Sequence, residues 1–168
     1  LAVTICLLFI TLTGCQPRPT VTLALLGDVM LGRGVNPTPG SLAYLRADLS
    51  SADLALANLE SPLAKTGGPL VAPVAPPSAG YNLCASPERA DLLPAWGFDL
   101  LSIANSQNLD CGPGGTADII SALDTVRITP IGPGMQPVYL EKNGLQLAFL
   151  AFDDISTALN ENAALQAI

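Results

Sequence analysis

The chain has 168 residues, and its 7 Lys and Arg against 14 Asp and Glu give a formal charge of −7, with no His. This acidic balance argues against a nucleic-acid partner, because nucleic-acid binding usually needs a basic face. It also predicts that any membrane contact comes from an anchor, since an acidic surface does little to attract anionic lipids. Hydrophobic residues make up 49% of the sequence, which suits one globular domain with a core.

The first residues have the features of an export signal. Leu1–Leu12 is an almost unbroken apolar run, shorter than the roughly 20 residues that cross a bilayer but typical of a signal-peptide core. The following Thr13-Gly14-Cys15 completes a segment that resembles a bacterial lipobox. We therefore expect residues 1–14 to be a lipoprotein signal peptide, Cys15 to carry the lipid, and residues 15–20 to be a tether. The alternative is a buried N-terminal helix that happens to end in Gly-Cys.

The first half of the remaining chain predicts two strands and one helix. The continuous apolar runs at 21–26 and 53–57 are typical of strands buried on both faces, as in a parallel sheet. Apolar spacing over 41–49 predicts a helix with Ser41 as its N-cap. Residues 61–80 are rich in Pro, Gly and Ala and predict a long loop or flap.

The second half continues the alternation of helices and strands. Ser86 and the Pro after it predict the start of a helix that ends at Gly97, and Asn143-Gly144 predicts a hairpin turn. The expected elements are helices over 86–96, from 114 or 116 onward, and over 157–168, with strands over 98–104, 128–131, 138–141 and 145–152. This order predicts an α/β fold with a mostly parallel sheet and flanking helices.

Two cysteines remain outside the predicted leader. Cys84 and Cys111 could form a disulfide outside the cytoplasm, but the sequence does not show whether they come within bonding range. Two buried free thiols are the alternative. A metal site built on these cysteines is disfavoured, because the chain has neither a CxxC pair nor a histidine.

Polar side chains follow three of the predicted strands. Asp28 comes after the first strand, Asn58 and Glu60 after the second, and Asn105, followed by Asp110, after the third. Ligands of open α/β sheets bind outside the carboxyl ends of the strands. Carboxylate and amide oxygens at such an edge suit a hard divalent cation such as Mg²⁺ or Mn²⁺, and a carboxylate cluster there is a candidate for acid–base chemistry.

Each of these residues also has a purely structural interpretation. Asp28 could cap the turn after its strand, with Gly32 and Gly34 serving tight backbone geometry. Asn58 and Asn105 could form Asx-turns with their own backbone, and Glu60 could face solvent. The argument for a site rests on the repetition of the same kind of strand ending.

Four segments together resemble the CapA family of poly-γ-glutamate capsule synthesis proteins, whose fold is similar to that of calcineurin-like metallophosphoesterases. They are GDVMLGR at 27–33, ANLESPL at 57–63, FDLLSIAN at 98–105, and LDCG at 109–112. The resemblance implies that residues 21–168 are the N-terminal portion of a CapA-like domain. Since the family also has a C-terminal half with histidine motifs, we expect the sequence to be an incomplete domain of a longer protein.

The resemblance implies a role outside the cytoplasm, at the bacterial cell membrane, in the synthesis, export or anchoring of the capsular polymer. Its partners would be capsule-synthesis membrane proteins or the anionic polymer. It also implies a divalent metal, Mn²⁺ or Mg²⁺, with Asp28, Asn58, Glu60 and Asn105 as ligands. Asp28, Glu60 and Asn105 would be catalytic, while Asn58 and Asp110 would bind substrate.

One residue departs from the family pattern. The third motif usually reads Ala-Asn-Asn-His, and Gln107 stands here where the histidine is expected. A neutral amide neither transfers a proton near neutral pH nor binds metal as imidazole does. The alternatives are therefore a non-catalytic scaffold that binds polymer or partner proteins, and a secreted metallophosphoesterase unrelated to capsule.

Overall fold

The computed structural model describes residues 18–32, 35–65, 83–132, 134, 136–155, 158 and 160–166. The predicted signal peptide, Cys15 and the first part of the tether lie outside these residues, as does most of the predicted 61–80 loop. None of the helices in the described part of the chain is long and apolar enough to cross a membrane.

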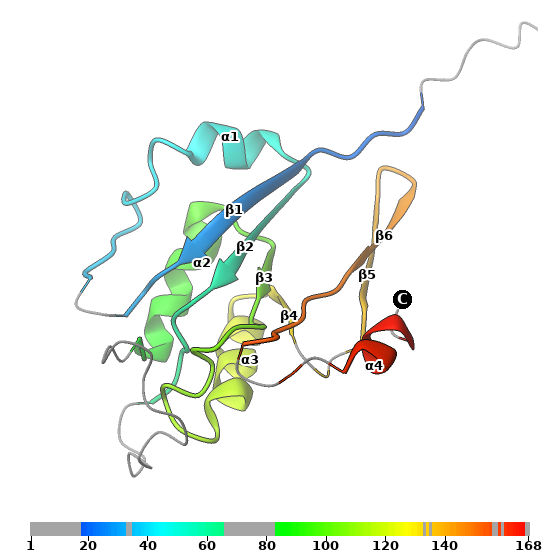
Figure 1. The fold of residues 1–168 in the computed structure, drawn as a ribbon. Coiled ribbons are helices and arrows are strands. Elements are labelled where there is room, and N and C mark those ends of the chain that lie inside the picture. Colours follow the sequence, from blue (N-terminus) through cyan, green and yellow to red (C-terminus); the bar gives the residue numbers. More distant parts are fainter. Residues whose placement is uncertain are drawn as a thin grey trace, which may run out of the picture.

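Four parallel strands form the main sheet, in the order β1-β2-β3-β4, and a separate antiparallel hairpin is formed by β5 and β6. The strands are β1 (Leu23–Val29), β2 (Leu54–Leu59), β3 (Leu100–Ser102), β4 (Thr129–Ile131), β5 (Val138–Lys142) and β6 (Leu145–Phe149). The helices are α1 (Arg46–Ser51), the 3₁₀ helix η2 (Pro87–Asp91), α2 (Leu92–Trp96), α3 (Gly115–Thr125) and α4 (Glu161–Gln166). The predicted α/β fold with a parallel sheet and flanking helices is confirmed (Figure 1).

The larger core lies between the sheet and the helices α2 and α3 (Figure 1). Leu101 of β3, Leu93 of α2 and Ile119 of α3 are fully buried there. Gly97 ends α2 with φ of 98°, a conformation that glycine adopts without steric cost. These contacts fix β2 and β3 in the middle of the domain.

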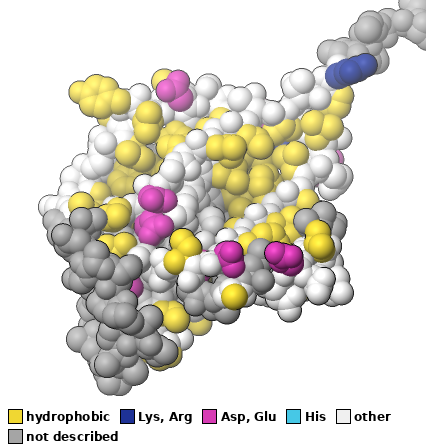
Figure 2. All heavy atoms as spheres, in the orientation of Figure 1, with side chains coloured by type: hydrophobic (Ala, Val, Ile, Leu, Met, Phe, Trp, Pro, Cys, Tyr) yellow, Lys and Arg dark blue, Asp and Glu magenta, His cyan; other side chains and the backbone are white. Residues whose placement is uncertain are grey.

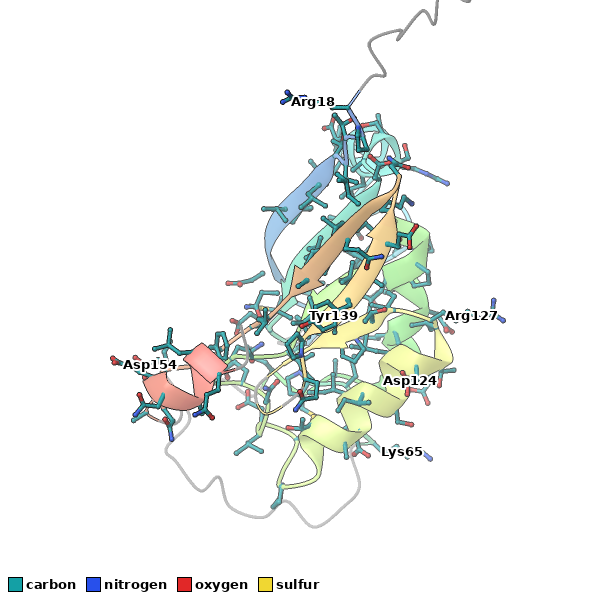
Figure 3. All side chains as sticks on the ribbon, turned by 90° about the vertical axis from the view of Figure 1, so that its right-hand side faces the viewer. Arg18, Lys65, Asp124, Arg127, Tyr139 and Asp154 are labelled. Carbon is teal, nitrogen blue, oxygen red and sulfur yellow. A yellow bond between two sulfur atoms is a disulfide. The ribbon has the colours of Figure 1, made fainter. Side chains whose placement is uncertain are left out.

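The hairpin covers part of the opposite face of the sheet, where a smaller core contains Leu54, Leu100 and Ile131. Its turn has Asn143 and Gly144 at φ of 53° and 77°, as the sequence predicts for a tight hairpin turn. Figure 3 shows the hairpin lying across the sheet, with α3 on the far side. The amide of Asn143 also donates to the carbonyl of Thr20 and to Asp53, at 2.9 and 3.0 Å, which ties the turn to the chain before β1.

The prediction that the apolar run at 21–26 is buried on both faces is wrong. Leu25 is 72% exposed and Leu23 is 40% exposed. The reason is that β1 lies at one edge of the sheet and the hairpin does not cover it: the smaller core under the hairpin contains residues of β2, β3 and β4 but none of β1. Figure 2 shows hydrophobic side chains gathered on this open face, between β1 and the hairpin. By contrast, β2 is buried or half-buried along its whole length, as predicted.

Two predicted helices differ in the structure. The helix expected from Ser41 begins only at Arg46, because residues 39–45 form successive turns and the Ser41 hydroxyl accepts the amide of Thr38 instead of capping a helix. The helix expected over 86–96 is divided into η2 and α2. Pro94 has no amide proton to give to an α-helical bond across this junction.

The predicted 61–80 loop begins inside the core. Ser61, Pro62, Leu63 and Ala64 are buried, and Leu63 pairs with Ala85 in an isolated parallel bridge. The chain after β2 is therefore held against the segment that precedes η2. The rest of the predicted loop lies outside the described residues.

Candidate functional site at the strand ends

The carboxyl ends of β1, β2 and β3 meet at one edge of the sheet. Asp28 of β1 is paired in register with Asn58 of β2, and Asn58 is paired with Ser102 of β3. Beyond the paired strands, the amide of Glu60 still donates to the carbonyl of Val29, at 3.1 Å. Parallel pairing thus brings the predicted residues from separate motifs to the same edge.

The side chain of Asn58 lies between the two carboxylates of the predicted site. Its Nδ2 donates to Asp28 Oδ1 and to Glu60 Oε1, at 2.8 Å each. One amide group therefore holds Asp28 and Glu60 close to a common point. No Asx-turn is formed by Asn58, and Glu60 is half-buried in this contact, so the structural interpretations of these two residues do not describe what is observed.

Asn105 joins the same cluster from the segment after β3. Its Nδ2 donates to Asn58 Oδ1 at 3.0 Å and to the Leu59 carbonyl at 2.9 Å, and its side chain is buried. Its Oδ1 accepts the amide of Gln107 at 3.1 Å. Asn105 is therefore both an Asx-turn residue, as the structural interpretation holds, and a member of the cluster. Gln107 is the residue whose amide closes this turn.

Asp110 lies on the segment after β3 and is near enough to Glu60 for its charge to raise the pKa of that carboxyl. Its Oδ2 accepts the amide of Leu83, at 2.8 Å, next to a disulfide between Cys84 and Cys111 whose Cα atoms are 5.2 Å apart. The pairing of these cysteines, which the sequence leaves open, is thus formed. Asp110 and the disulfide together fasten the segment after β3 to the chain before η2.

The carboxylates of the site influence one another. Burial raises the pKa of Glu60 above its ordinary value, the Asn58 hydrogen bond opposes this, and the negative charges of Asp28, Asp110 and Asp153 raise it further. Burial also raises the pKa of Asp110, against the lowering effect of the Leu83 amide. The negative charge at this edge therefore makes a proton or another cation favourable there.

Sequence reasoning missed two residues near this edge. Asp153 follows β6 and contributes to the negative potential at Glu60; a carboxylate directly after a predicted strand is the same signal that identified Asp28. Ser61 is fully buried, and its hydroxyl accepts the amides of Leu31 and Gly32, at 2.9 Å each. Nothing in the residue type distinguishes this serine from a loop serine.

The donor set fits a hard cation only if amide oxygens take part. Within the described residues, no group of three or more His, Cys, Asp and Glu side chains is placed to hold a metal ion. Asp28 and Glu60 supply two carboxylates that already share one positively polarised N–H₂ group, and a cation would use the same oxygens. Asn58 and Asn105 are the amides that could complete such a set. In this structure, however, Asn58 presents its Nδ2 to the carboxylates, and the Oδ1 atoms of both residues already accept hydrogen bonds.

A groove of about 510 Å³ opens beside Asp28. Its lining includes the buried side chains of Trp96 and Phe98. Trp96 Nε1 donates to the carbonyl of Thr38 at 3.0 Å, next to Pro37 of the lining. Room for a bound molecule therefore exists next to the carboxylates.

Comparison with known proteins identifies a family and a curated relative. The family described as "Bacterial capsule synthesis protein PGA_cap" matches residues 22–167. The chain is also similar to the capsule biosynthesis protein CapA of Bacillus anthracis, with 26% identity over 150 residues. That alignment covers 82% of this chain but only 36% of the relative, so the chain spans about a third of the length of the curated relative that it matches.

Proposed function

Because this chain belongs to the PGA_cap family of bacterial capsule synthesis proteins, we propose that it acts in the synthesis, export or anchoring of a capsular polymer, poly-γ-glutamate, outside the cytoplasm. In this proposal a lipid on Cys15 holds the domain at the cell membrane, where capsule-synthesis membrane proteins and the polymer itself are its partners. The site at the strand ends would bind a divalent cation, Mn²⁺ or Mg²⁺. The metallophosphoesterase-like character of the fold is part of the same proposal.

The observation that carries the proposal is the position of Asn58 between Asp28 and Glu60. Two carboxylates, one from the end of β1 and one from the residue after β2, are held at 2.8 Å from the same amide nitrogen. A domain that needed only stability would gain little by placing two negative charges together at a partly buried edge, since like charges close together are destabilising. Such an arrangement is typical of a functional site.

The residues of the site have different roles in this proposal. A bound divalent cation would polarise a phosphoryl or acyl oxygen, or activate water. Asp28 and Glu60 bind the cation, and Asn58 fixes the separation of their oxygens. Asn105 holds Asn58 in place through its own Nδ2. Asp110, adjacent to the site, is the proposed contact for substrate.

Gln107 supports a second candidate function, that of a non-catalytic scaffold. With glutamine where the family has histidine, the described site has no imidazole to transfer protons near neutral pH. A scaffold would keep the fold and bind polymer or partner proteins without chemistry. The two functions differ in whether Asp28 is needed.

Complementation separates the two functions. In a strain that lacks the gene, Asp28→Ala would fail to restore capsular polymer if the site acts with a metal, while Asp48→Ala, an exposed carboxylate of α1, would restore it. Both variants are checked for membrane-fraction abundance by immunoblot. Full restoration by Asp28→Ala would reject the metal-dependent function and favour the scaffold. Failure of the wild-type gene to restore the polymer would reject the capsule role.

A further inference from the structure

We infer that Ser61 is a positioning residue, which fixes the relative places of Asp28 and Glu60 by joining the segments that follow β1 and β2. The inference rests on the proposed function, because it concerns the same site. Ser61 is bonded covalently to Glu60, and its hydroxyl binds the chain shortly after Asp28. The hydrogen bonds of its hydroxyl are to the backbone amides of Leu31 and Gly32, so it acts on the carboxylates through the backbone.

The hydrogen bonds of Ser61 continue the pairing of β1 and β2 beyond the strands. The ladder pairs Asp28 with Asn58 and Val29 with Leu59, and the Glu60 amide then donates to the Val29 carbonyl. At the next residue, backbone pairing is replaced by the Ser61 hydroxyl, which accepts from both Leu31 and Gly32. The two chains thus stay joined on both sides of the carboxylates.

Loss of these hydrogen bonds should destabilise the folded chain, because they lie in the core. Ser61 and Leu31 are both 0% exposed, so water cannot replace the hydroxyl as a partner for the two amides. The carbonyl of Leu31 is held as well, by the guanidinium of Arg89, which also donates to the Val35 carbonyl at 2.9 Å. Both backbone polar groups of Leu31 are therefore bound by side chains from other segments.

The segment has little space to find another position. A Cβ on Gly32 would lie 2.1 Å from the Leu83 carbonyl oxygen, so the chain passes directly against the residue before Cys84. Removal of the Ser61 hydroxyl would leave two unpaired amides in this tight contact. Because the contact at Gly32 leaves no room for a local adjustment, the two amides could find new partners only if the whole segment after β1 were displaced, and Asp28 would then move relative to Glu60.

The test compares three variants by NMR and by Mn²⁺ calorimetry. Ser61→Ala removes the acceptor, Ser61→Thr keeps it at the same position, and Ile119→Val trims a fully buried side chain of α3 as a control for lost stability. We expect the side-chain amide signals of Asn58 and Asn105 to move in Ser61→Ala, and to return toward wild-type positions in Ser61→Thr. Ile119→Val should leave them unchanged.

The expected loss of Mn²⁺ affinity in Ser61→Ala is about 10- to 100-fold, as for other residues that orient metal ligands. Unchanged amide signals in Ser61→Ala, or equal changes in Ile119→Val, would overturn the inference. If the wild-type chain binds no Mn²⁺, the metal part of the proposed function fails, and the amide signals alone decide the role of Ser61.

A measurement on the wild-type chain covers the case in which Ser61→Ala does not fold. The Leu31 and Gly32 amides should exchange with solvent at least about 100-fold more slowly than unprotected amides, since both are bonded in the core. Rapid exchange of these two amides in the folded protein would contradict the inference.

Discussion

β1 and β3 belong to the same parallel sheet, and both deliver a residue to the candidate site, but they are held in different ways. Leu100 and Leu101 of β3 are fully buried between two layers, whereas Leu25 of β1 is 72% exposed. Asn105 therefore follows a strand that is packed on both faces, and its own side chain is bonded to Asn58 and to the Leu59 carbonyl. Asp28 depends on polar contacts that join the end of β1 to β2, made by Asn58, Glu60 and Ser61.

The largest expected effect contrasts the two strands directly. Leu101→Ala should lower the free energy of unfolding by about 2–5 kcal/mol, because it leaves a cavity in the main core. Leu25→Ala removes the same atoms from an exposed face and should cost less than about 1 kcal/mol. Urea denaturation of both variants measures the difference, and equal losses would show that β1 is as well packed as β3.

The disulfide after β3 provides the second test. Cys84 and Cys111 are separated by 27 residues, and a disulfide that closes a loop of this size typically contributes about 2–4 kcal/mol. The double variant Cys84→Ser, Cys111→Ser should unfold at correspondingly lower urea than the wild-type chain. An added reductant should lower the wild-type midpoint and leave that of the double variant unchanged; a wild-type midpoint insensitive to reductant would contradict the account.

Asn58→Asp tests the polar contacts at the end of β1. It replaces the amide donor between Asp28 and Glu60 by a third carboxylate, which should lower the free energy of unfolding at neutral pH by about 1–3 kcal/mol. The loss should shrink as the pH falls and the carboxylates are protonated. The matched control is Asn36→Asp, at an exposed position, which should change stability little; equal losses in the two variants would contradict this role of Asn58.

Glu60→Gln should have the smallest effect. Unlike the changes above, it should raise the free energy of unfolding at neutral pH. The pKa of Glu60 in the folded chain is raised above its ordinary value of 4.5, so the folded state binds the proton more tightly than the unfolded state. The stability that the folded state gains from binding this proton more tightly is fully present below the ordinary pKa of Glu60. It is lost as the pH rises through the raised pKa. The neutral amide of the variant can still accept from Asn58, so the variant should be more stable at neutral pH, by less than about 1 kcal/mol.

Urea unfolding of the Glu60→Gln and wild-type chains measures this effect at several pH values between about 4 and 7. The two chains share every carboxylate except that of Glu60, so the difference between them isolates this one group. The wild-type chain should lose stability relative to the variant as the pH rises. A relative gain by the wild-type chain over this range would mean that Glu60 is stabilised as a carboxylate in the folded state.

The sequence was informative where a local pattern determines the structure. The apolar runs, the Asn143-Gly144 turn and the stop at Gly97 predicted the elements, and the polar residues after three strands predicted which side chains meet. The exposure of Leu25 could not be predicted, because an apolar run does not reveal whether a distant hairpin will cover its strand. Ser61 was missed because its partners, Leu31 and Gly32, are about 30 residues away in sequence and are bound through their backbone.

The central claim is that the ends of β1 and β2 form a cation site, and calorimetric titration of Mn²⁺ into the folded chain tests it most directly. The account predicts saturable binding that is lost in Asp28→Ala and kept in Asp48→Ala. No binding by the folded wild-type chain, or equally tight binding by Asp28→Ala, would contradict it.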